Sequence, residues 1–104
     1  METDDQALTV TMSSVGGTTT IAAAGDIDMG TCDTLEEHLG QALDGGEEID
    51  LDLAEVEFMD STGISCLLHL RARAQEQNVA VRLVSASPAV ERILHLSGLG
   101  DLFA

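Results

Sequence analysis

Apolar and polar residues alternate with a period of two in four segments of the chain, which is typical of strands that bury one face. The first two segments, residues 8–13 and 18–24, are separated by Gly16-Gly17, and this pair predicts a tight hairpin turn. The other two segments, at residues 49–53 and 79–83, carry a similar alternation. We therefore expect a hairpin followed by two further strands.

Three other segments repeat apolar residues at the spacing of an amphipathic helix. They predict helices over residues 31–43, residues 64–77, and a third stretch that begins at Ser87-Pro88 and ends at Gly98. A loop at residues 25–28 precedes the first helix. A short connector containing Val56 and Phe58 leads to the second.

The resulting order, β-β-α-β-α-β-α, predicts one α/β domain over residues 1–104 with a four-stranded mixed sheet. Strands joined through a helix should run parallel, by right-handed crossovers. Each predicted strand also keeps a polar side, whereas a sheet covered on both faces would be apolar on both. We therefore expect the three helices to cover mainly one face.

Aliphatic side chains must build most of the core, because aromatic residues make up only 2% of the chain. Phe58 and Phe103 are the expected aromatic core members. Cys32 and Cys66 lie far apart within predicted helices, so we interpret them as small buried core residues rather than a disulfide pair. The three histidines show no metal-ligand spacing, and we predict no metal and no cofactor: His38, His69 and His95.

The charge balance excludes several classes of partner. Nineteen acidic residues face four arginines and no lysine, for a formal net charge of -15. Nucleic acids and anionic membranes both require clustered basic side chains. The N-terminus lacks the pattern of a signal peptide, and no apolar run approaches the ~20 residues needed to cross a bilayer. We expect a cytoplasmic protein. The negative charge is explained either by the solubility and colloidal stability that it provides or by a partner that is less acidic or locally basic.

The junction Asp60-Ser61-Thr62-Gly63 carries the candidate chemistry. A short polar side chain at a helix start is usually an N-cap; if the helix begins near Thr62, either Ser61 or Asp60 occupies that position, and a cap alone is one interpretation of Ser61. The free N–H groups and the helix dipole would also accept a phosphate ester on Ser61. Thr62 is an alternative acceptor. Gly63 would leave the first turn uncovered and open to a partner.

A phosphate on Ser61 would bring about -1.5 to -2 charges beside Asp60 and, if the loops converge, near Asp26 and Asp28. It would repel an acidic partner and spoil a dry contact over Gly63 and Ile64. A nucleophilic serine enzyme would need a base and an orienting carboxylate within reach. The chain has no Gly-x-Ser-x-Gly elbow. We therefore predict that the protein is not an enzyme, with a small hydrolase kept as the third hypothesis.

Four segments resemble the STAS-domain family of anti-sigma factor antagonists. The most specific is the phosphorylation motif, and all four occur in the family's order: Gly25-Asp26-Ile27-Asp28, Phe58-Met59-Asp60-Ser61-Thr62-Gly63-Ile64, Ser85-Ala86-Ser87-Pro88-Ala89-Val90 and Leu96-Ser97-Gly98-Leu99. The resemblance implies a STAS fold over nearly the whole chain.

The resemblance also implies a role in transcription regulation by partner switching. Ser61 would be phosphorylated by an anti-sigma factor that is also a serine kinase, and Asp28 matches the aspartate beside the phosphorylation site. The unphosphorylated form would capture the anti-sigma factor and so release a sigma factor, and a serine phosphatase would reset it. The implied partner-binding residues lie in the two loops: Asp26, Asp28, Asp60, Thr62, Gly63 and Ile64. The alternative is a STAS scaffold of a larger signalling or transport assembly that is never phosphorylated.

Overall fold

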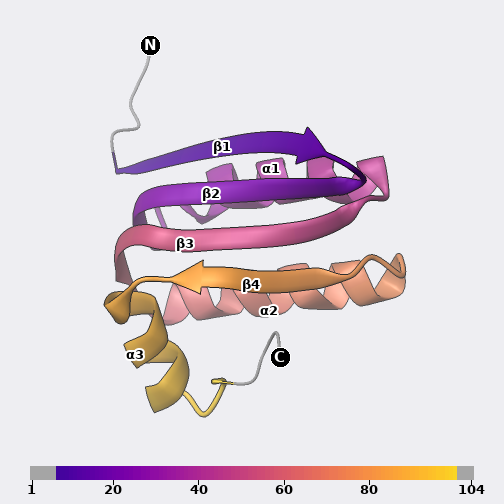
Figure 1. The fold of residues 1–104 in the computed structure, drawn as a ribbon. Coiled ribbons are helices and arrows are strands. Elements are labelled where there is room, and N and C mark those ends of the chain that lie inside the picture. The colour runs from indigo at the N-terminus through magenta and orange to yellow at the C-terminus, as the bar shows by residue number, and fades with distance from the viewer. Residues whose placement is uncertain (1–6, 101–104) are drawn as a thin grey trace.

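The computed structural model describes residues 7–100 and confirms the predicted order of strands and helices (Figure 1). Phe103 lies outside the described residues. The elements are β1 (Leu8–Val15), β2 (Thr18–Ile27), α1 (Cys32–Gly45), β3 (Glu48–Met59), α2 (Ser61–Glu76), β4 (Val81–Ala86) and α3 (Pro88–Leu96).

The four strands form one mixed sheet in the order β1-β2-β3-β4. β1 and β2 pair antiparallel as a hairpin, whereas β2 pairs with β3, and β3 with β4, in parallel. Both parallel pairs are joined through a helix, as the sequence pattern predicts. The carboxyl ends of β2, β3 and β4 therefore lie at the same end of the sheet, on the left in Figure 1.

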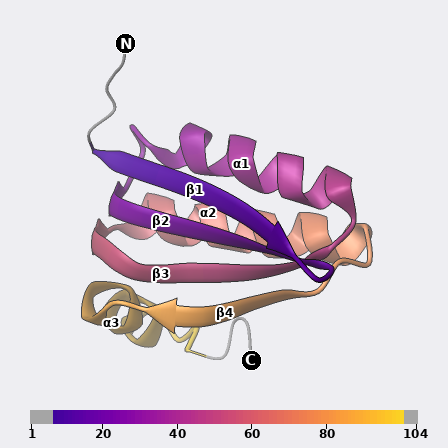
Figure 2. The same cartoon turned by 45° about the horizontal axis from the view of Figure 1, so that its top comes forward.

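Helices α1 and α2 lie side by side across one face of the sheet, and α3 lies at its edge beside the carboxyl end of β4 (Figures 1 and 2). The inward side chains of the strands and these helices form an aliphatic core that includes Ile21, Leu51, Leu35, Leu39 and Leu67, each at most 1% exposed. The prediction that the helices cover mainly one face is confirmed for α1 and α2, whereas α3 lies at the edge of the sheet.

Phe58 is 48% exposed, so its predicted place in the core is wrong. Two register shifts between β2 and β3 each give β3 an extra residue: the first, before Glu55, brings Val56 onto the core face, and the second, between Val56 and Phe58, keeps Phe58 from following it. Val56 and Met59 therefore point into the core, and Phe58 points away from it.

Two segments predicted as loop or connector are continuous strand. β2 runs through Gly25 to Ile27, and β3 runs through Val56 and Phe58 to Met59. Gly25 has a φ of +116°, and a Cβ there would collide with the carbonyl oxygen of Ala7, so only glycine allows β2 to continue along β1.

Other element boundaries also differ from the predicted ones. Helix α2 begins at Ser61 rather than Ile64, because Asp60 already caps it. It ends at Glu76, one residue earlier than predicted. Strand β4 begins at Val81 rather than Val79 and runs three residues past Leu83, to Ala86.

Cys32 and Cys66 form a disulfide between α1 and α2, so the prediction of two unpaired core cysteines is wrong. The two helices lie side by side, which brings the Cα atoms to 6.3 Å, within the range that a disulfide spans. Cys66 is buried, as expected, whereas Cys32 is half-buried.

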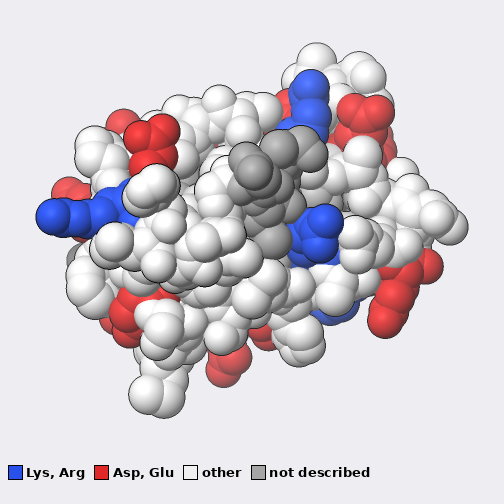
Figure 3. All heavy atoms as spheres, turned by 90° about the horizontal axis from the view of Figure 1, so that it is seen from below, with Lys and Arg blue, Asp and Glu red and all other residues white. Residues whose placement is uncertain are grey.

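Basic side chains are scattered over the surface rather than clustered. Seen from below the view of Figure 1, the arginines are separated by uncharged and acidic atoms (Figure 3). Among the described residues, the arginines on this face do not gather into a positive patch of the kind that binds a phosphate backbone. Within the described residues, no helix has the length and apolar character required to cross a membrane.

Candidate phosphorylation and partner-binding site

The two loops that contain the predicted site residues meet at the carboxyl end of the sheet. Ile27 and Met59 are partners at the ends of the parallel strands β2 and β3. The backbone N–H of Asp60 donates to the carbonyl oxygen of Ile27 at 3.4 Å. Asp28 directly follows β2, and Asp60 directly follows β3. The loops therefore converge, which was the condition for a phosphate on Ser61 to lie near Asp26 and Asp28.

Asp60, rather than Ser61, caps helix α2. Its Oδ1 accepts hydrogen bonds from the backbone N–H groups of Thr62 at 2.9 Å and Gly63 at 3.2 Å. Ser61 is the first helical residue and is exposed. Its carbonyl oxygen accepts from Ser65 Oγ at 3.2 Å, and within residues 7–100 no hydrogen bond involves its own hydroxyl. The cap interpretation therefore belongs to Asp60, and the Ser61 side chain is exposed beside it.

Hydrogen bonds fix the loop between β2 and α1. Asp28 Oδ1 accepts from the N–H of Gly30 at 2.9 Å. The buried Thr31 hydroxyl donates to the carbonyl oxygen of Asp26 at 2.7 Å and accepts from the N–H of Asp28 at 3.0 Å. These hydrogen bonds hold Asp26 and Asp28 in half-buried positions at the carboxyl end of the sheet, beside the start of α2.

Gly63 and Ile64 are buried, so the expectation that glycine leaves the first turn uncovered is wrong. A Cβ on Gly63 would collide with the Met59 side chain and would stand 3.0 Å from both Cγ2 and the carbonyl oxygen of Ile27. The absence of a side chain lets α2 begin directly against the ends of β2 and β3. Thr62 is half-buried.

Two exposed apolar side chains at this end of the sheet were missed by the sequence prediction. Met29, which directly follows Asp28, is 78% exposed, and Phe58, opposite Asp26 in the sheet register, is 48% exposed. The sequence signal that could have identified Met29 was a methionine in an otherwise polar loop. Phe58 carried no such signal, because its orientation depends on the irregular register of β3.

The predicted site is an acidic surface. Asp26, Asp28 and Asp60 lie at or just after the ends of the paired strands β2 and β3, and the residues that connect these strands to α1 and α2 include no basic side chain. An exposed hydroxyl, an acidic rim and two exposed apolar side chains are features of a protein-binding surface. They do not form the nucleophile–base pair of a hydrolase.

The chain belongs to the STAS-domain family. A family model described as "Mlab, STAS domain" matches residues 10–104, which is most of the chain. The matched region includes both loops of the site and all three helices.

Relatives within this family bear regulatory names. The anti-sigma-F factor antagonist RsfB of Mycobacterium tuberculosis is 31% identical over 97 residues, covering 92% of this chain and 79% of RsfB. The crystal structure of an anti-sigma factor antagonist from Mycobacterium paratuberculosis has a TM-score of 0.82 and 28% identity, covering 92% of this chain and 82% of that one.

A further structural neighbour, the anti-sigma factor antagonist SpoIIAA in its unphosphorylated form, has a TM-score of 0.74 and 23% identity. The match covers 89% of this chain and 84% of SpoIIAA, and at this identity it shows the shared fold.

Proposed function

We propose that this protein is an anti-sigma factor antagonist that binds its partner when Ser61 is unmodified and loses it when Ser61 is phosphorylated. The proposal rests on the difference in hydrogen bonding between two adjacent residues at the start of α2, Asp60 and Ser61. Asp60 makes both capping hydrogen bonds, and the exposed Ser61 hydroxyl beside it makes none within the described residues. The antagonist names of RsfB and the paratuberculosis protein support the choice of partner class.

Charge is the physical basis of the proposed switch. A phosphate adds about -1.5 to -2 charges at neutral pH. The N–H groups of Thr62 and Gly63 already bind Asp60, so the phosphate would stand next to a carboxylate rather than in an unoccupied cradle. The positive end of the α2 dipole offsets only part of this repulsion.

Hydration adds to the effect of charge. Burying a phosphate in a contact that includes Met29 and Phe58 would require removal of its water, which is costly without compensating hydrogen bonds. Because Ser61 is exposed, the modification leaves the core packing unchanged. The predicted result is loss of partner binding with the fold intact.

The proposed partners are an anti-sigma factor with serine kinase activity and a serine phosphatase that removes the phosphate. The three acidic loop residues would contact a locally basic surface of the anti-sigma factor: Asp26, Asp28 and Asp60. Thr62 is half-buried and would lie at the margin of that contact, and Gly63 and Ile64 would support it from below.

The experiment is titration calorimetry of the purified protein against the candidate anti-sigma factor from the source organism. Wild type and Ser61→Ala should bind, and Ser61→Asp should bind at least about tenfold more weakly, a difference of about 1.4 kcal/mol. Ser13→Asp is the matched control, because Ser13 is exposed on β1 near the hairpin, at the opposite end of the sheet. Equal affinity of Ser61→Asp and Ser13→Asp would instead favour a scaffold that phosphorylation does not control.

A further inference from the structure

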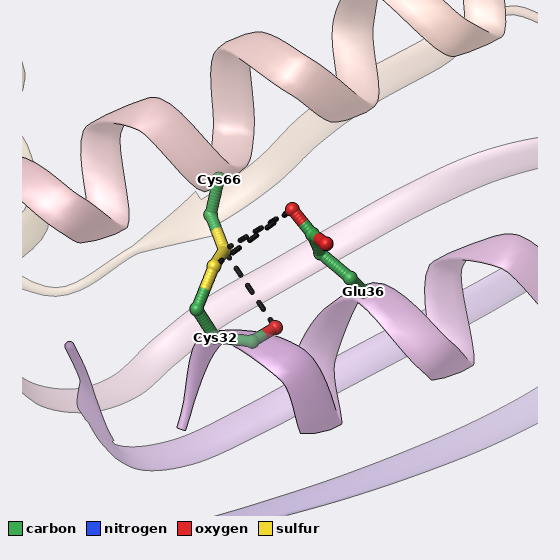
Figure 4. A group of neighbouring side chains, drawn as sticks. All are labelled: Cys32, Glu36 and Cys66. Atoms are coloured by element: carbon green, nitrogen blue, oxygen red, sulfur yellow. Dashed lines mark hydrogen bonds between the residues drawn. A yellow bond between two sulfur atoms is a disulfide. The ribbon is translucent and has the colours of Figure 1, made fainter. Parts of the chain in front are cut away.

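A cluster of metal-ligating side chains lies between α1 and α2, outside the Ser61 site. Glu36 Oε2 stands 3.8 Å from Cys32 Sγ and 3.9 Å from Cys66 Sγ, and all three ligand atoms lie within 4.8 Å of one another (Figure 4). The two sulfur atoms are joined as a disulfide. One carboxylate oxygen of Glu36 faces that sulfur pair (Figure 4).

His69 supplies a fourth potential ligand. Its Nδ1 lies 3.4 Å from Glu36 Oε2. Cys32 and Glu36 are four residues apart on α1, and Cys66 and His69 are three apart on α2, so each pair shares one helix face. The two faces meet where the helices pack side by side.

One side of the cluster is buried between the two helices, and the other side is exposed to solvent. Cys66 is buried, and Cys32 and Glu36 are half-buried. The His69 side chain is 70% exposed. A cation could enter from the solvent side, and the exposed imidazole has the freedom to turn toward it.

We propose that, once the disulfide is reduced, Cys32, Cys66, Glu36 and His69 bind one zinc ion. Two thiolates, an imidazole and a carboxylate are all ligands that zinc accepts in tetrahedral sites. With Zn–S of about 2.3 Å and Zn–O of about 2.0–2.2 Å, tetrahedral geometry places sulfur and oxygen about 3.5–3.7 Å apart. In the disulfide form the sulfur–oxygen separations are 3.8 and 3.9 Å, close to that value, and after reduction the two sulfur atoms would have to move apart, to about 3.8 Å, to bind the same ion.

The proposed reductant is a dithiol, and a phosphine can replace it in the test tube. The reductant transfers two electrons and two protons, the Cys32–Cys66 S–S bond breaks to give two thiols, and the reductant becomes a disulfide. Each thiol then loses its proton to solvent as its sulfur binds Zn²⁺. The disulfide and the zinc site use the same sulfur atoms, so they exclude each other and oxidation would release the metal. Either form links α1 to α2.

Cobalt(II), a spectroscopic substitute for zinc, tests the site in the full chain. The protein is reduced with a phosphine, freed of metal with a chelator and titrated with cobalt under anaerobic conditions. We expect one cobalt per chain, the intense visible bands of tetrahedral cobalt, a thiolate charge-transfer band in the near ultraviolet, and displacement of cobalt by zinc. The oxidised protein should show none of these.

Matched variants separate the four ligands from their neighbours. Cys66→Ser should abolish the thiolate band, and Glu36→Gln and His69→Ala should each weaken zinc binding by at least about tenfold in competition with a chromophoric chelator. Glu37→Gln and His95→Ala, which alter residues outside the cluster, should leave it unchanged. Circular dichroism checks that each variant is folded.

The proposal is overturned if the reduced wild type binds cobalt no more tightly than the Cys32→Ser/Cys66→Ser double variant. Octahedral spectra unaffected by any of the four ligand substitutions would overturn it as well, as would equal binding by the oxidised protein. None of these outcomes depends on the phosphorylation of Ser61 or on the partner.

Discussion

At the scale of single residues, Asp60 and Ser61 are neighbours with different tasks. The Asp60 carboxylate satisfies two N–H groups at the start of α2, and the Ser61 side chain satisfies none. A residue that caps the helix and a residue with an exposed hydroxyl are therefore adjacent, which is the arrangement that the proposed switch requires.

Replacement of Asp60 should cost stability, and replacement of Ser61 should not. Asp60→Ala removes the cap and should lower the free energy of unfolding by about 0.5–2 kcal/mol. Asp60→Asn retains a capping oxygen and should recover most of that loss. Ser61→Ala should lie within about 0.5 kcal/mol of wild type. Urea unfolding measures all three, and a Ser61→Ala loss as large as that of Asp60→Ala would mean that Ser61 has a structural role.

Gly63 should not tolerate a side chain, although alanine favours helices. Gly63→Ala would push a methyl group into Met59 and Ile27, and overpacking of this kind costs about 1–3 kcal/mol. Gly40→Ala is the control on α1, where the nearest atom is the flexible Arg73 side chain at 3.4 Å, and it should stabilise by up to about 1 kcal/mol. Thermal unfolding compares them, and similar melting temperatures would contradict the close packing at Gly63.

At the scale of elements, Glu47 ties the loop between α1 and β3 to the hairpin. The Thr19 hydroxyl donates to Glu47 Oε1 at 2.9 Å, and the Ser14 hydroxyl donates to the same oxygen. These two hydrogen bonds hold the pKa of Glu47 below its ordinary value of 4.5, and the one from Ser14 has the larger effect. The charged carboxylate is thus favoured in the folded state.

Protonation of Glu47 should contribute to a loss of folding stability at acidic pH. Because its folded pKa is lowered, its contribution is fully present above the ordinary carboxyl pKa and is lost as pH falls through the folded value. Wild type should exceed Glu47→Gln in unfolding free energy at pH 7, and the difference should shrink steadily below about pH 4.5. Urea unfolding at several pH values tests this. A difference that grows in acid would have the wrong sign.

The elements were predictable where local patterns determine them. The alternation of Ile49, Leu51 and Leu53 identified β3, and helical spacing identified α1 and α2. The extension of β3 through Phe58 was not predictable, because it depends on register shifts against β2. The cluster of Cys32, Glu36, Cys66 and His69 was also missed, because its two halves come from different helices. Only the fold places those faces together.

The candidate site was predictable only in part. The residue types at Asp60-Ser61-Thr62-Gly63 indicated a hydroxyl at a helix start, and the family resemblance implied that Asp28 lies beside it. Which residue caps the helix depends on side-chain geometry, as does the burial of Gly63. Neither could be deduced from the sequence.

At the scale of the whole molecule, the net charge of -15 acts on a body of 38 × 29 × 20 Å. At about 10 mM salt the Debye length is about 30 Å, so carboxylates repel one another across the entire fold. At about 100 mM it is about 10 Å, and repulsion is limited to near neighbours. Self-repulsion of this kind destabilises the compact state.

Salt should therefore stabilise the protein. We expect the melting temperature at neutral pH to rise when NaCl is increased from about 10 to about 100 mM. The rise should be smaller at pH 5, closer to the isoelectric point of about 4.1, where protonation reduces the net charge. Differential scanning calorimetry measures both. A melting temperature that falls with salt at neutral pH would show that favourable ion pairs outweigh the repulsion.

The most direct test of the central claim is to map phosphate after incubation with the partner kinase and ATP. Tandem mass spectrometry of wild type, Ser61→Ala and Thr62→Ala would locate the modified residue. We predict one phosphate, on Ser61, in wild type and Thr62→Ala, and none in Ser61→Ala. Phosphate that persists unchanged in Ser61→Ala would contradict the assignment of Ser61 as the switch.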